Sequence, residues 1–206
     1  MMTLWSHHLI HRLDDSCHFK VEDPHGCHAW PFALLTKTKW SKNVRTPKQC
    51  PDQIILAAEE WRTCAILNLA NCLEMWLGQH PRALYLFTTD EGVDNKGVPL
   101  GPLNVNKQCA NRVKVVCWNN EEFKALEDEV GDHNGIGTCS NRKHAADRAD
   151  KQGADTHQIE FRGRWTGEKG SRVVHKHYIN SESPYNDAPV ASLLCDKGPI
   201  RYKLQE

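Results

Sequence analysis

The sequence lacks the features that mark secreted and membrane-spanning proteins. It has no run of 18 or more apolar residues, and its N-terminus lacks the basic, apolar and small-residue order of a secretory signal. We therefore expect a soluble intracellular chain. Low-complexity linkers and internal repeats are also absent, so the 206 residues predict a single domain over 1–206 with a full hydrophobic core.

A disulfide framework is also not expected. The nine cysteines are an odd number, are scattered along the chain and include no CxxC pair. Several lie in apolar runs, where a buried cysteine behaves as a small hydrophobic residue. We interpret them as reduced thiols.

The chain has no excess of charge of one sign, because 26 basic residues balance 26 acidic ones. This argues against a protein that coats nucleic acid indiscriminately. The charges are nevertheless unevenly distributed: residues 31–50 contain five basic and no acidic residues, whereas residues 119–132 contain six acidic residues and one lysine. One face of the molecule is therefore expected to be basic while another repels phosphate.

Hydrophobic periodicity predicts a mainly α fold with a small antiparallel β-sheet. Short stretches rich in β-formers, near 18–21 and 32–40, predict the sheet, and 82–88 is a further strand candidate. The segment 90–102 is rich in glycine, proline, asparagine and aspartate and predicts a loop. Apolar residues at helical spacing predict helices over 4–15, 52–78 (one long or two consecutive), 105–130, 139–151, 155–162 and 172–179.

Three residues in the second half of the chain suit phosphodiester chemistry that needs no metal. Arg142 is predicted in the first turn of a helix, where its guanidinium and the helix N-terminus both favour a phosphate. Trp165 offers an indole N–H donor. Tyr178 offers a hydroxyl that attacks phosphorus and keeps the energy of the cut bond in a phosphotyrosyl linkage.

These residues lie in the segments G-T-C-S-N-R-K (137–143), R-G-R-W (162–165) and H-K-H-Y (175–178), which resemble box II of tyrosine recombinases. The crypton-like eukaryotic group, found in algal and other protist genomes, is the most similar. Upstream, L-I-H-R-L-D-D (9–15) resembles the box I helix of that family. A-L-L-T-K-T-K-W-S-K-N-V (33–44), followed by C-P-D-Q-I-I-L (50–56), resembles the hairpin that carries the catalytic lysine.

The resemblance implies a tyrosine recombinase catalytic domain without the usual N-terminal DNA-clamping domain. It implies cleavage and rejoining of one DNA strand through a 3′-phosphotyrosine, a homo-oligomer on DNA, a location in the nucleus and no metal or cofactor. The tail 183–206 would then contact a neighbouring subunit through Val190, Leu193 and Leu194. The implied catalytic residues are Arg12, Lys37, Cys139, Arg142, Trp165 and Tyr178, and the implied DNA contacts are Lys39, Lys42, Arg45, Lys143, Arg162 and Arg164.

One position differs from the family motif, and one catalytic role has alternative candidates. The histidine of the family's His-x-x-Arg is replaced by Cys139, and a thiol is a weaker hydrogen-bond donor than imidazole. Lys39 and Lys42 are alternatives to Lys37 as the catalytic lysine. A catalytically decayed or domesticated DNA-binding domain is therefore the second hypothesis.

Two further readings come from side-chain chemistry alone. Cys139 at a helix N-terminus would be a candidate nucleophile, but no His and Asp partners are identifiable for it. A small zinc-stabilised interaction module is the last alternative, with His7 and His11 on one helical face. Its candidate ligands are His7, His8, His11, Cys17, His18, His25, Cys27 and His28.

Overall fold

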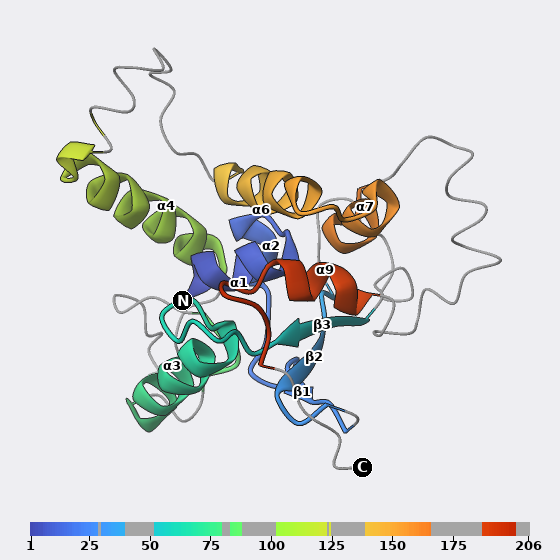
Figure 1. Ribbon diagram of the computed structural model, residues 1–206. Helices are drawn as coiled ribbons and strands as arrows, with labels where there is room; N and C mark the ends of the chain where they lie inside the picture. The colour runs from blue at the N-terminus through green and yellow to red at the C-terminus, as the bar shows by residue number, and fades with distance from the viewer. Residues whose placement is uncertain are drawn as a thin grey trace.

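The computed structural model shows helices packed mainly against one edge of a small antiparallel sheet (Figure 1). It describes residues 1–28, 30–39, 52–79, 83–87, 102–122, 124, 139–165 and 187–200. The mainly helical class with a small antiparallel sheet is thereby confirmed. The strands are β1 (His25–Gly26), β2 (Ala33–Lys37) and β3 (Asp52–Leu56), and the helices are α1 (Met2–Leu9), α2 (Leu13–Cys17), α3 (Ala65–Gln79), α4 (Pro102–Trp118), α6 (Ser140–Lys151), α7 (Thr156–Gly163) and α9 (Ala188–Leu193).

The sheet has the order β1-β2-β3, and its register pairs Ala33 with Leu56 and Lys37 with Asp52. The prediction that the helical segment 52–78 begins at Asp52 is wrong, because residues 52–56 form the third strand. Successive residues of β3 enter different cores: Ile55 packs beside α1, whereas Ile54 and Leu56 pack toward α9. A short apolar run buried on both faces has the same sequence pattern as a buried helix.

The predicted helix over 4–15 is broken into two. Ile10 caps α1 with a left-handed φ of 53°, and α2 begins after Arg12. The break lets consecutive apolar residues reach separate cores, since Leu9 packs with the first cluster and Ile10 packs against α6 and α9. His11 and Arg12 consequently lie in the link between the two helices.

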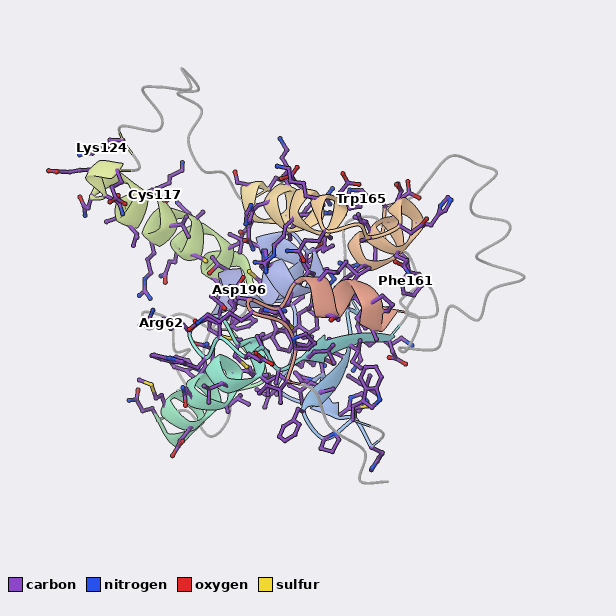
Figure 2. All side chains as sticks on the ribbon, in the orientation of Figure 1. Arg62, Cys117, Lys124, Phe161, Trp165 and Asp196 are labelled. Carbon is purple, nitrogen blue, oxygen red and sulfur yellow. The ribbon has the colours of Figure 1, made fainter. Side chains whose placement is uncertain are left out.

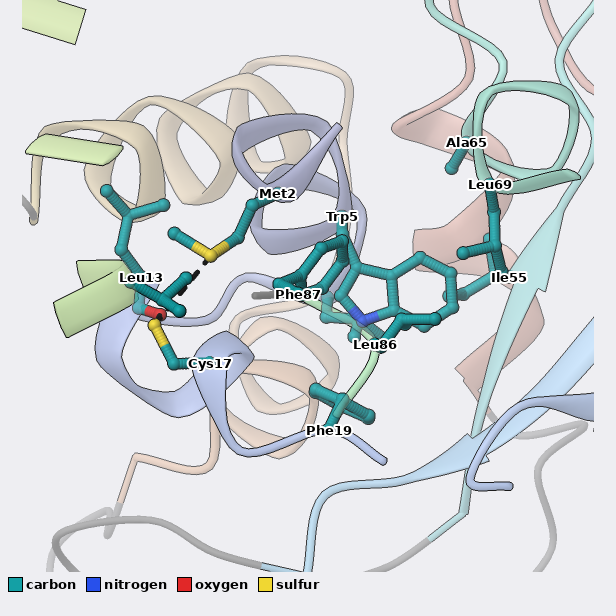
Figure 3. Close-up of a cluster of buried hydrophobic side chains, with 12 residues drawn as sticks. Met2, Trp5, Leu13, Cys17, Phe19, Ile55, Ala65, Leu69, Leu86 and Phe87 are labelled. Carbon is teal, nitrogen blue, oxygen red and sulfur yellow. Dashed lines mark hydrogen bonds between the residues drawn. The ribbon is translucent and has the colours of Figure 1, made fainter. Parts of the chain in front are cut away.

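The largest core cluster lies where α1, α2, α3 and β3 meet (Figure 3). Trp5 is fully buried there and meets Phe19 edge-on at 5.7 Å and Phe87 at 6.4 Å between ring centroids. Aromatic pairs in this geometry add stabilisation beyond the area that they bury. This core fixes the link that carries Arg12.

The helices predicted over 139–151 and 155–162 are confirmed as α6 and α7. Gly153, with a φ of 88°, follows the end of α6, and Asp155 caps α7 by accepting a hydrogen bond of 2.8 Å from the His157 backbone N–H. Helix α4 ends at Trp118 and projects from the body of the molecule (Figure 1). The remaining prediction, a helix over 172–179, lies outside the described residues.

The C-terminal segment is part of the core. Val190 and Leu194 are almost completely buried against α6 and α1, and the Ile200 N–H donates to the Ala57 carbonyl at 2.8 Å. The expectation that Val190 and Leu194 contact a neighbouring subunit is therefore wrong. Their apolar surface is already covered within the chain.

Candidate active site

Arg142 is at the centre of the candidate site, in the first turn of α6. Its side chain donates to the Gly163 carbonyl, and its guanidinium lies 4.3 Å from the centroid of the Trp165 ring. The residue is only 7% exposed, and its Nε has no hydrogen-bond partner among the described residues. Burial, together with the charge of Arg12, lowers the pKa of Arg142 to about 10. The guanidinium therefore lies in an environment that favours an added negative charge.

The link between α1 and α2 brings Arg12 to the same place. The Arg12 backbone N–H donates to an Asp15 carboxylate oxygen at 3.3 Å, which anchors the start of α2. Its side chain is half-buried and its charge is close enough to disfavour protonation of Arg142. Two arginines from segments 130 residues apart thus share one electrostatic environment.

Arg164 joins this group from the end of α7. Its backbone is left-handed, with a φ of 53°, and its guanidinium pairs with the same Asp15 oxygen at 3.2 Å. Both side chains of this pair are more than nine-tenths buried. The Asp15 carboxylate thus pairs with the Arg164 guanidinium, accepts from the Arg12 backbone N–H and acts on the charge of Arg142. The three arginines carry more positive charge than this one carboxylate neutralises, and such an excess attracts an anion.

Trp165 lies where α6 and α7 meet (Figure 2), and its ring stacks on the Arg142 guanidinium. Its ring packs so closely over Gly163 that a Cβ at this glycine would lie 2.5 Å from two ring carbons. Only glycine permits this approach. Trp165 keeps 39% of its surface exposed, so the indole is accessible to a ligand while it stacks on Arg142.

His11 is the residue of this region whose role the sequence did not reveal. It is fully buried, stacks on Phe19, and its Nε2 lies 3.0 Å from the Gln53 amide oxygen and 3.3 Å from the Thr38 hydroxyl. Burial, followed by the charges of Arg164 and Arg142, lowers the pKa of His11 well below its usual value. From the sequence, His11 was a candidate only for a zinc site. In the structure its neutral imidazole joins the link that carries Arg12 to the sheet.

Lys37 is the last residue of β2, and it is Thr38, the residue after it, that joins the His11 network. Among the described residues, no hydrogen bond or ion pair joins the Lys37 side chain to the arginines. Lys39, one of its alternatives, instead pairs with the buried Asp23 at 2.7 Å, and this hydrogen bond raises the pKa of Lys39. A raised pKa makes Lys39 a poorer proton donor. Lys42, the other alternative, and Arg45 lie outside the described residues.

The expectation that Arg162 contacts DNA is wrong. Its side chain is completely buried, pairs with Asp187, and donates to the carbonyls of His8 at 2.7 Å and Ile54 at 2.9 Å. An arginine enclosed in this way joins α7 to α1, β3 and α9 and has no surface to offer a ligand. Asp187 was not singled out from the sequence, because nothing local marks it as the partner of Arg162.

The remaining candidate residues lie near the start of α6 or outside the described chain. Cys139 is exposed at the N-cap of α6, and Lys143 is exposed one residue beyond Arg142. Asn141 fixes this end of the helix, because its amide donates to the Thr3 carbonyl at 2.6 Å. Tyr178, the proposed nucleophile, is not among the described residues, so its position relative to the arginines stays a prediction.

Two further findings bear on function. In the described ranges, no three His, Cys, Asp or Glu side chains are grouped so that they could hold a metal ion, and no helix is long and apolar enough to cross a membrane. In comparisons with known proteins, no family model, no curated protein and no solved structure matches this chain.

Proposed function

We propose that this protein cuts and rejoins DNA strands at a phosphodiester held by Arg12, Arg142 and Trp165. The observation that carries the proposal is the convergence of these residues from three separate segments, in the order that the tyrosine recombinase resemblance implied. Buried guanidinium groups with an excess of positive charge suit non-bridging phosphate oxygens.

In this proposal the Tyr178 hydroxyl attacks phosphorus and forms a 3′-phosphotyrosyl bond while the bond to the 5′-oxygen breaks. Lys37 supplies the proton that the departing oxygen needs. Negative charge on the phosphoryl oxygens is greatest at the pentacoordinate stage, where Arg12 and Arg142 stabilise it; loss of one such donor costs about 10² to 10³ in rate. Rejoining is the reverse sequence and needs no ATP, because the phosphotyrosyl bond retains the energy.

A suicide substrate tests the proposal. A DNA duplex nicked next to the cleavage position loses its short 5′-hydroxyl fragment after attack, so the covalent protein–DNA adduct accumulates on a denaturing gel. We expect an adduct with the unchanged chain, and none with Tyr178→Phe. Tyr85→Phe removes a hydroxyl elsewhere and serves as the matched control. An adduct that persists in Tyr178→Phe would exclude this nucleophile.

A second candidate function is DNA binding without cleavage, and the specific observation in its favour is Cys139. The exposed thiol stands at the start of α6, one helical turn from Arg142, where the family has an imidazole. If only this position limits the reaction, Cys139→His should raise cleavage by about 10² to 10⁴, the usual effect of a positioned acid–base group. A variant that binds DNA and remains inert favours the binding function.

A further inference from the structure

A pocket with a volume of about 520 Å³ lies between α4, the end of α3 and the start of α1. Its innermost wall is formed by Leu86 and Phe87, which belong to the largest core cluster (Figure 3). Arg12, Arg142 and Trp165 do not line it, so it is separate from the candidate active site. Small-molecule ligands usually occupy pockets of about 300 to 1,000 Å³. The size therefore fits a small molecule.

The pocket continues along an apolar stripe of α4. Four residues of this stripe line the pocket and recur at the three- or four-residue spacing of one helical face: Val105, Cys109, Val113 and Val116. The stripe starts in the core and ends in solvent, because Val105 is 5% exposed whereas Val116 is 68% exposed. Helix α4 projects from the body of the molecule (Figure 1). Apolar surface is therefore left at the mouth of the pocket for a ligand to cover.

A cation lies in the wall of this apolar pocket. Arg112 lines it, one residue before Val113 of the stripe. Burial raises the pKa of Cys109, and the charge of Arg112 opposes this rise, so the guanidinium lies near the Cys109 thiol. Helix α4 also carries Lys107 and Lys114 and has no acidic residue. The pocket therefore complements a ligand with an apolar chain and an anionic end.

We propose that this pocket binds a free long-chain carboxylate, whose chain lies along the α4 stripe and whose carboxylate meets Arg112. A free acid fits better than a second copy of the chain, because a twofold contact on this face would bring two basic α4 helices together. Binding here does not require the DNA chemistry proposed above. Three thiols line the pocket and report on its occupancy: Cys72, Cys109 and Cys117.

The test adds dodecanoate to the reduced chain and measures, by peptide mass mapping, how fast N-ethylmaleimide labels each cysteine. We expect dodecanoate to slow the labelling of Cys72, Cys109 and Cys117 several-fold and to leave that of the exposed Cys139 unchanged. Butyrate, which lacks the long chain, and dodecyltrimethylammonium, which reverses the charge, should protect these thiols much less. Labelling of the buried Cys195 should not rise, which shows that dodecanoate does not unfold the domain.

Paired variants on α4 locate the binding site. Val116→Glu puts a charge into the apolar mouth and should weaken dodecanoate binding, measured by calorimetry, about tenfold or more. Val115→Glu, at a 58% exposed position that does not line the pocket, should leave binding unchanged. Arg112→Gln should weaken binding about tenfold, the usual effect of losing a hydrogen bond to a charged group, and Lys114→Gln should weaken it much less.

The proposal would be overturned by dodecanoate that protects none of the three thiols, or by equal weakening of binding in Val116→Glu and Val115→Glu. Protection of the same thiols that appears without ligand, as the protein concentration rises, would assign the pocket to a second copy of the chain and would also overturn it.

Discussion

Gly163 allows Trp165 to stack on Arg142 because it has no side chain. The Trp165 ring occupies the position where a Cβ would lie, and Arg142 donates to the Gly163 carbonyl. A methyl group added at Gly163 would therefore displace the Trp165 ring from its stacked position. The ring belongs to a partly exposed side chain and has room to move outward, so we expect the domain to stay folded when it shifts.

We predict that Gly163→Ala displaces Trp165 from Arg142 with little loss of stability. The indole fluorescence at this position should shift, and cleavage or phosphate binding should fall by roughly the 10² typical of a misplaced catalytic group. Other tryptophans contribute to the signal, so the shift is measured against Trp165→Phe. Unchanged fluorescence and activity would contradict the close packing of Gly163 and Trp165.

The ion pair of Arg162 and Asp187 is part of the folded core. Both side chains are completely buried, and the pair links α7 to the start of α9. Removing one partner leaves a buried charge without compensation, which typically costs about 3 to 5 kcal/mol. The pair therefore stabilises the junction between α7 and α9, and Arg164 follows directly after α7.

We predict that Asp187→Ala lowers the free energy of unfolding by about 3 to 5 kcal/mol, measured by urea denaturation. Asp147→Ala, which removes an exposed i,i+4 pair with Lys151, should cost less than about 1 kcal/mol. The double variant Arg162→Met with Asp187→Leu should recover only part of the loss, because it removes the unpaired charge but leaves the His8 and Ile54 carbonyls and the Ile54 N–H without these partners. Equal effects for Asp147 and Asp187 would show that the buried pair is not maintained in solution.

At the scale of elements, α9 is a structural helix. Its residues fill two clusters, since Val190 packs with α6 and Ala191 packs with β3. The helix covers the sheet beside α6 and α7 (Figure 1). Loss of this helix would expose the residues that hold β3 and the link at Ile10 in place.

We predict that Leu194→Ala destabilises the monomer by about 2 to 5 kcal/mol, the usual cost of a core leucine. Because Leu194 packs within the chain, the thermal midpoint should fall by the same amount at every protein concentration. The half-buried Leu193 provides the control, since its replacement by alanine should cost less. An unchanged midpoint combined with a loss of oligomers would instead assign Leu194 to a subunit contact.

At the scale of the whole molecule, buried histidines make the fold sensitive to acid. Burial lowers the pKa of His7 to about 4 and of His8 to about 3, and it holds His11 neutral as well. Above pH 6.5 these groups are neutral in both the folded and the unfolded chain. Below pH 6.5 the unfolded chain takes up protons first, so stability falls as the pH drops toward 4.

The predicted slope is about 1.4 kcal/mol per pH unit for each histidine that stays neutral in the folded state. His8→Gln, which keeps a donor for the Thr63 carbonyl, should flatten the decline of unfolding free energy between pH 6 and about 4. Asn111→Gln, an exposed position without an ionisable group, should leave the slope unchanged. The same slope in all three proteins would show that His8 takes up its proton in the folded state.

The fold class and the ends of α6 and α7 were predictable from the sequence, and so were Arg12, Arg142 and Trp165 as candidate residues. Those features are local, because Gly153 and Asp155 act on neighbouring backbone and a motif is read along the chain. Three features could be known only from the folded chain: residues 52–56 are a strand, Ile10 ends α1, and Arg162 is enclosed. Burial and charge pairing depend on partners far away in sequence, as Asp187 is for Arg162.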